Sequence, residues 1–128
     1  MALVLKRENN NKRRVYVVCG DGELDEGNVW EAAMFVAKNR LNNLTLIIDR
    51  NKMQIDGFTE DVMPLEDLKA KWQSFGYHVL EINGNDIEAV IDACAMAKTI
   101  EEKPTAIIAH TIPGDLNIAD RSDFPGFT

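Results

Sequence analysis

Two short polar segments, each placed just after an apolar run, hold the residues of this chain that could do chemistry. Gly20-Asp21-Gly22 follows the apolar run Val15–Cys19, and Asn51 comes shortly after the run Leu44–Ile48. Carboxylate and amide oxygens are ligands that Mg²⁺ accepts, often together with phosphate groups. Glycines allow a tight turn and a close approach of a ligand to the backbone. Gly-Asp-Gly is also a common turn, and Asp25 stands where the dinucleotide fingerprint G-x-G-x-x-G needs its third glycine.

The elements that must position these residues alternate along the chain. Strand-like runs rich in β-branched residues cover Val15–Cys19, Leu44–Asp49, His78–Ile82 and Thr105–His110. Helical periodicity covers about 28–39, 65–75 and 86–99, with Gly76 expected to end the second helix and Asp86 to cap the third. This order predicts an α/β domain with a mostly parallel sheet, helices on both faces and strands covered on both sides.

The chain divides into three parts. Residues 1–13 are expected to form a polar N-terminal stub, 14–112 the α/β domain and 113–128 an irregular tail. Open parallel sheets bind ligands beyond the carboxyl ends of their strands. Asn51 follows Asp21 by 30 residues, the length of one strand–helix–strand unit. We therefore expect these two side chains on neighbouring strand ends, holding one Mg²⁺ and a diphosphate with help from a nearby helix N-terminus.

The two segments together resemble the thiamine diphosphate motif, in which GDG is followed by about 30 residues and Asn. GDGELDEGNVWEAAMFVAKNRLNNLTLIIDRNKMQIDG, FGYHVLEINGNDIEAV and KPTAIIAHTI resemble transketolases, over roughly residues 14–112. The stretches GELDEGNVWEA and QIDG are typical of transketolases and argue against a deoxyxylulose-phosphate synthase or a ketoacid dehydrogenase component. The resemblance implies the thiamine diphosphate-binding fold and transfer of a two-carbon ketol unit between sugar phosphates.

The resemblance also implies a ligand set. Asp21, the side chain of Asn51 and the backbone carbonyl of Met53 would bind Mg²⁺. Gly20 and Gly22 would lie against the diphosphate of thiamine diphosphate.

Three acidic residues near these positions have more than one explanation. Glu26 matches a family glutamate near the dimer interface, which communicates with the aminopyrimidine of the cofactor and is the implied catalytic residue. Its alternative explanation is favourable placement near a helix N-terminus. Glu31 is close enough to join that carboxylate, although favourable placement near a helix N-terminus explains it equally well. Asp49 is either a turn residue at a strand end or a partner of the ligands.

Other candidates have simpler structural explanations. Trp30, Met34 and Phe35 are expected to pack in a core or an interface rather than to contact the cofactor. His78 is expected to be structural. His110 lies at the ligand side of the sheet, where approach to a phosphate is the less favoured of its two explanations.

The family pattern also contains parts that have no counterpart here: an upstream glycine-rich segment with histidines, a Lys-Gly-Lys-Gly-like loop after the fourth strand, and a pyrimidine-binding domain. We therefore expect a diphosphate-binding subunit or fragment that is inactive alone, forms a homo-oligomer and needs a pyrimidine-domain partner chain. The alternative is a non-catalytic assembly or remnant module of the same fold.

Composition excludes several other functions. With 14 basic and 21 acidic residues the net charge is −7, which excludes a broad basic surface for nucleic acid. The sequence contains no run of 18 apolar residues, so no membrane span is expected. Cys19 and Cys94 lie in apolar segments and are expected to be buried free thiols, as in the cytoplasm.

Overall fold

The computed structural model describes residues 1–8, 11–54 and 57–112. Its centre is a four-stranded parallel sheet in the order β1-β2-β6-β5. The strands are β1 (Val15–Gly20), β2 (Leu44–Arg50), β5 (His78–Asn83) and β6 (Thr105–His110). All four lie where the apolar runs predict them, and their parallel pairing confirms the predicted fold class.

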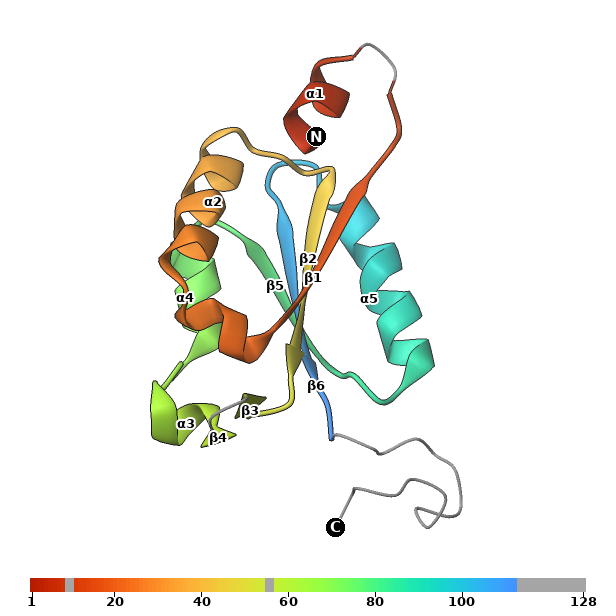
Figure 1. Cartoon of the computed structure of the whole chain (residues 1–128). Helices are drawn as coiled ribbons and strands as arrows, with labels where there is room; N and C mark the ends of the chain where they lie inside the picture. Colours follow the sequence, from red (N-terminus) through yellow and green to blue (C-terminus); the bar gives the residue numbers. More distant parts are fainter. Residues whose placement is uncertain (9–10, 55–56, 113–128) are drawn as a thin grey trace.

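Helices cover the two faces of this sheet. α2 (Gly27–Lys38) and α4 (Leu68–Ser74) lie on one face, and α5 (Ile87–Thr99) lies on the other (Figure 1). A polar cap fixes where α5 begins: Asp86 Oδ1 accepts from the backbone N–H groups of Glu88 and Ala89 at 3.0 and 3.3 Å. α4 starts later than predicted because Asp67 caps it and accepts from Ala70 N at 2.9 Å. Gly76 follows α4 with a φ of 91°, the left-handed conformation expected of a C-terminal stop.

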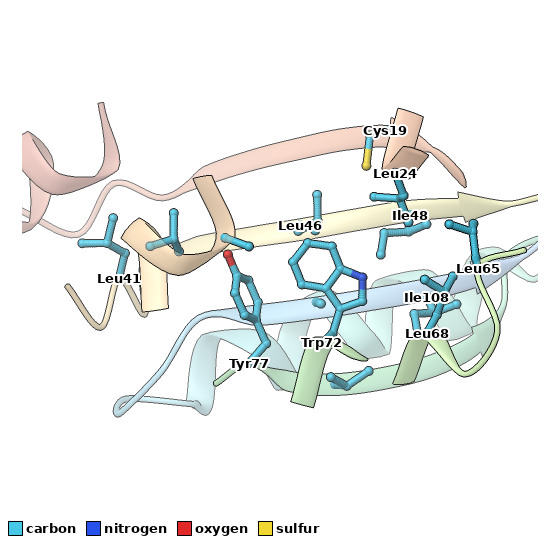
Figure 2. Packing of buried hydrophobic residues seen from close by; sticks show 14 of the residues in the cluster. Cys19, Leu24, Leu41, Leu46, Ile48, Leu65, Leu68, Trp72, Tyr77 and Ile108 are labelled. Atoms are coloured by element: carbon cyan, nitrogen blue, oxygen red, sulfur yellow. The ribbon is translucent and has the colours of Figure 1, made fainter. Parts of the chain in front are cut away.

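The main core lies between the sheet and the two helices α2 and α4. Figure 2 shows Trp72 of α4 packed against the sheet, near Leu46 and Ile48 of β2 and Ile108 of β6. The two central strands are the most buried; in β6 only the last residue is exposed. The central strands are thus covered on both faces, as predicted.

The edge strand β1 departs from that prediction. Tyr16, Val17 and Val18 are 44%, 42% and 69% exposed. Within the described sheet β1 pairs with β2 alone, so one of its sides has no neighbouring strand. The expectation that every strand is covered on both faces is therefore wrong for β1, because apolar content alone does not distinguish an edge strand from a central one.

Short elements lie outside the predicted pattern. α1 (Ala2–Arg7) occupies the segment expected to be a polar stub, and its Ala2 is only 5% exposed and belongs to the main core. Beyond β2 come an antiparallel pair, β3 (Met53–Gln54) and β4 (Gly57–Phe58), and the short helix α3 (Thr59–Val62). The predicted tail, 113–128, lies outside the described residues. Within the part of the chain that the structure describes, no helix has the length and apolar character needed to cross a membrane.

Candidate metal and diphosphate site at the strand ends

The predicted site residues gather at the carboxyl ends of β1 and β2. The register places Gly20 opposite Asp49, so the two strands finish side by side. A 3₁₀ turn, η1 (Asp21–Asp25), follows β1 directly, and β3 lies beside it. β3 and β4 lie at the bottom of Figure 1, at the end to which the strand arrows point. The backbone of Met53 is therefore held next to the turn that carries Asp21.

The carboxylate of Asp21 is the most buried charged group of this edge, with 0% exposure. Its Oδ2 accepts two hydrogen bonds, from Lys52 N at 2.8 Å and from Arg50 Nη1 at 2.9 Å. Its Oδ1 is buried and has no hydrogen-bond partner among the described residues. A buried acceptor left unmatched is costly, so half of this carboxylate is in place to receive a further positive or hydrogen-bonding group.

Arg50 is a site residue that the sequence analysis missed. It ends β2, and its side chain is only 8% exposed beside the fully buried Asp21. An arginine at this depth needs an anionic partner, and the turn after β1 supplies one. The available signal was its position: Arg50 stands directly before Asn51, in the segment that follows an apolar strand.

Asp49 orients Asn51. Asp49 Oδ2 accepts a hydrogen bond from Asn51 Nδ2 at 3.3 Å, and Asp49 Oδ1 accepts one from the hydroxyl of Thr111. The first bond turns the amide nitrogen of Asn51 toward Asp49 and its oxygen to the opposite side of the group. The carboxylate of Asp49 therefore contacts Asn51 and also ties the ends of β2 and β6 together.

Gly20 has a backbone that does not itself require glycine. Its φ and ψ are −74° and 158°, an extended conformation open to any residue. Among the described residues, a Cβ added there would have one neighbour within 4 Å, Glu23 Oε1 at 3.9 Å, and this same oxygen accepts from Gly20 N at 3.2 Å. Space beside the backbone is therefore kept clear at the position where a ligand is predicted, and Gly22 follows within the same turn.

The two glutamates of α2 lie apart from the buried carboxylate. Glu26 is the residue before α2 and is exposed, and Glu31 is exposed on the helix itself. Among the described residues, neither side chain forms a hydrogen bond or an ion pair. The structure thus brings Asp21, Asn51 and the backbone of Met53 together, while Glu26 and Glu31 face outward from this chain.

Three apolar residues of α2 have two different environments. Trp30 stacks on Trp72 with ring centroids 4.9 Å apart, and its Nε1 donates to Leu24 O at 2.8 Å, which confirms packing. Met34 and Phe35 are 57% and 52% exposed. For Met34 and Phe35 the expected core position is therefore wrong. Of the two alternatives, packing in an interface is the one that fits an exposed helix face.

The two histidines differ in their surroundings. His78 is half-buried at the start of β5. His110 ends β6 on the ligand side of the sheet, and its Nε2 lies 3.2 Å from Glu81 Oε1. Lys69 Nζ lies 3.5 Å from the other oxygen of Glu81, so His110 is one member of a surface charge cluster.

Both cysteines are free, and Cys19 is buried beside the site while Cys94 is half-buried. Burial, together with the nearby carboxylates of Glu23 and Asp21, raises the pKa of the Cys19 thiol from its usual 9.0 to about 11.

A pH dependence of stability follows from Cys19. A raised pKa in the folded state means that its contribution is complete below pH 9 and is lost as the pH rises toward 11. We expect the free energy of unfolding to fall between these values by up to about 1.4 kcal/mol per pH unit. Urea unfolding at several pH values measures the slope. The variant Cys19→Ala should lack this part of it, and an equal slope in both proteins would contradict the assignment to Cys19.

The side chains at this edge limit which ligands a hard cation could have. Across residues 1–8, 11–54 and 57–112, no three histidine, cysteine or carboxylate side chains lie close enough together to hold a metal ion. A cation at this edge would therefore combine the single carboxylate of Asp21 with neutral amide and backbone oxygens. Such oxygen-rich sets of low charge, shared with phosphate, are typical of Mg²⁺.

Solved structures identify the fold class. A transketolase from Campylobacter jejuni is 31% identical and superposes with a TM-score of 0.76 over 88% of this chain and 18% of its own. A transketolase from Pichia stipitis, solved with xylulose 5-phosphate, is 37% identical with a TM-score of 0.71 over 76% of this chain and 14% of its own. The fold is therefore the thiamine diphosphate-binding α/β fold.

Sequence comparison then identifies the family. A family model described as the transketolase thiamine diphosphate-binding domain matches residues 6–121. The 6-deoxy-6-sulfo-D-fructose transketolase subunit SqwG of Clostridium sp. (strain MSTE9) is 47% identical over 78% of this chain and 36% of its own. One of the apulose-4-phosphate transketolase subunits of Actinobacillus succinogenes is 42% identical over 87% of this chain and 40% of its own. The chain belongs to the transketolase family, and it spans 36–40% of the length of these two curated relatives.

Proposed function

We propose that this chain supplies the part of a transketolase site that binds Mg²⁺ and the diphosphate of the cofactor. Together with other polypeptide chains it would move a two-carbon ketol unit between sugar phosphates. The observation that supports it most directly is the carboxylate of Asp21, which is fully buried with one oxygen unpartnered among the described residues. Purely structural ion pairs match their lone pairs, because each unmatched buried acceptor is destabilising.

The residues present fit the cofactor. Asp21 Oδ1, the amide oxygen of Asn51 and the carbonyl of Met53 would hold Mg²⁺, with the Asn51 amide oriented by its bond to Asp49. The clear space at Gly20 would admit the diphosphate, with the backbone of Gly22 beside it. This arrangement uses positions that come from two strand ends and the following loop, so the fold itself orients the ligands.

Thiamine diphosphate, when bound, supplies the carbanion chemistry of the transfer, and the protein supplies binding, orientation and electrostatics. In this chain the strand ends fix the diphosphate end of the cofactor. Glu26 stands exposed at the start of α2, where it would meet the aminopyrimidine side of a cofactor bound between chains. No described residue of this chain is assigned to the activation of the aminopyrimidine.

A partner chain is part of the proposal. SqwG and the apulose-4-phosphate relative are both named as transketolase subunits. α2 presents exposed Met34 and Phe35 on the helix that begins after Glu26. An apolar surface of this kind is typical of a protein interface. It supports association with a second copy and with a chain that carries the pyrimidine domain.

Calorimetric titration of thiamine diphosphate tests the proposal. We expect binding that requires Mg²⁺. The variant Gly20→Ala should bind at least about tenfold more weakly because its methyl group fills the space kept for the diphosphate. The same variant should be as stable as the wild type or more stable by about 0.4–1 kcal/mol, since alanine adopts this extended backbone without strain.

The two readouts of this experiment move in opposite directions, which separates a ligand site from a structural turn. Binding that is equal with and without Mg²⁺ would contradict the metal assignment. Unchanged affinity in Gly20→Ala would contradict the position of the diphosphate. Absence of binding to the chain, also when a pyrimidine-domain partner has been added, would leave the non-catalytic assembly module as the function.

A further inference from the structure

The geometry points to Arg50 as the residue that makes Mg²⁺ binding depend on the diphosphate. This inference rests on the proposed function and specifies how its two ligands are coupled. The guanidinium and the metal would share one carboxylate, that of Asp21. The protein would then hold the cation weakly until an anionic ligand arrives.

The position of Arg50 is fixed from both ends. Its backbone carbonyl, at the end of β2, accepts from Thr111 N at 3.2 Å. Its Nη1 donates to Asp21 Oδ2 at 2.9 Å, and the two side chains are 8% and 0% exposed. Lys52 N also donates to Oδ2, at 2.8 Å. One oxygen of Asp21 therefore accepts from a guanidinium and a backbone N–H, while the other, Oδ1, lacks a partner among the described residues.

The charges at this site have a direct consequence. Before any ligand binds, Arg50 already compensates the single negative charge of Asp21. A Mg²⁺ ion at Oδ1 would add two positive charges beside a buried guanidinium, and like charges repel strongly where the effective dielectric constant is near 20 rather than 80. A diphosphate brings several negative charges to the same place and reverses the sign of this balance. Metal and diphosphate should therefore bind with positive coupling.

Arginine suits this role better than lysine. A buried lysine can escape repulsion by releasing a proton, whereas the guanidinium keeps its charge in proteins. Loss of a proton therefore cannot relieve the repulsion between Arg50 and the metal, whereas an added anion can. Movement of the side chain is opposed by the packing that leaves Arg50 almost fully buried.

The test compares Arg50→Gln, which removes the charge, with Arg50→Lys, which keeps it. Arg13→Gln is the matched control, because it removes one positive charge at the opposite end of β1, where Arg13 pairs with Glu8 on the surface. MgCl₂ is titrated into each protein by calorimetry, first alone and then with saturating inorganic pyrophosphate. Complex formation between Mg²⁺ and pyrophosphate in solution is the same for every variant and cancels in the comparison.

Arg50→Gln should bind Mg²⁺ alone about tenfold more tightly than the wild type, and pyrophosphate should then improve its Mg²⁺ affinity about tenfold less. Its melting temperature should also rise more on addition of MgCl₂ alone. Arg13→Gln should behave like the wild type, and Arg50→Lys should lie between the wild type and Arg50→Gln, because a buried lysine can release its proton. Equal Mg²⁺ affinity in Arg50→Gln and the wild type would overturn the inference.

The wild type alone can also overturn the inference, should Arg50→Gln fail to fold. If it binds Mg²⁺ as tightly without pyrophosphate as with it, Arg50 imposes no coupling and the inference is wrong. If it binds Mg²⁺ under neither condition, also when a pyrimidine-domain partner has been added, the proposed function falls as well. If Arg50→Gln does fold and its Mg²⁺ binding depends on pyrophosphate as much as that of the wild type, the proposed function stands and the role of Arg50 alone is overturned.

Discussion

Replacing Asp21 with alanine should abolish the Mg²⁺-dependent binding of thiamine diphosphate and lower the free energy of unfolding by about 3–5 kcal/mol. The stability loss arises because Arg50, only 8% exposed, would be left without its buried counter-charge. The backbone N–H of Lys52 would lose its acceptor as well. Calorimetry measures the loss of binding and urea unfolding the loss of stability. A change of this size approaches the whole stability of a small domain, so unfolding should be followed at low temperature.

A double variant separates the two effects. In Asp21→Ala/Arg50→Met both buried charges are gone, and replacement of a whole buried ion pair by apolar groups is often neutral or stabilising. We expect the double variant to recover most of the lost stability while Mg²⁺-dependent binding stays absent. Asp21→Asn, which keeps the size of the side chain, should also fail to bind Mg²⁺. Full stability in Asp21→Ala would show that the pair with Arg50 contributes nothing to the fold.

Local chemistry explains why so much of the fold could be predicted from sequence. Apolar β-branched runs determine where strands lie, and β6 begins and ends at the residues that the pattern predicts. Caps determine where helices begin and end, as at Asp86 and Gly76. The spacing between Asp21 and Asn51 predicted adjacent strand ends, because one strand–helix–strand unit returns the chain to the same edge of a parallel sheet.

What could not be predicted depends on contacts between distant segments. The pairing of Arg50 with Asp21 and of Asp49 with Thr111 depends on which strands become neighbours. The exposure of β1 depends on its place at the edge of the described sheet, which its own composition does not reveal. The antiparallel pair of β3 and β4 involves only two residues on each side, too few for a periodic pattern.

The aromatic cluster behind the site connects packing to ligand binding. Trp30 stacks on Trp72, and Phe75 and Tyr77 surround the pair, with ring centroids 4.9–6.4 Å apart. The Nε1 of Trp30 donates to the carbonyl of Leu24 at 2.8 Å. Leu24 belongs to η1, the same turn that carries Asp21. A residue of α4 therefore supports the turn of the candidate site through one ring contact and one hydrogen bond.

Replacing Trp72 with alanine should therefore lower the free energy of unfolding by about 3–5 kcal/mol and also weaken Mg²⁺-dependent binding of thiamine diphosphate. The stability loss follows from burial, since Trp72 is 1% exposed and fills the space between α4 and the sheet (Figure 2). The binding loss follows because Trp30 loses its stacking partner and no longer holds Leu24 firmly. Urea unfolding and calorimetry measure the two effects.

Two milder substitutions show which path carries the effect on binding. Trp72→Phe keeps an aromatic ring and removes an indole N–H that is buried and unpartnered among the described residues, so its stability loss should be well below that of the alanine variant. Trp30→Phe keeps the ring contacts and removes the hydrogen bond to Leu24, which should lower stability by only about 1 kcal/mol and still weaken binding. If Trp30→Phe binds the cofactor like the wild type while Trp72→Ala does not, support of the site would run through the packing of the sheet rather than through Leu24.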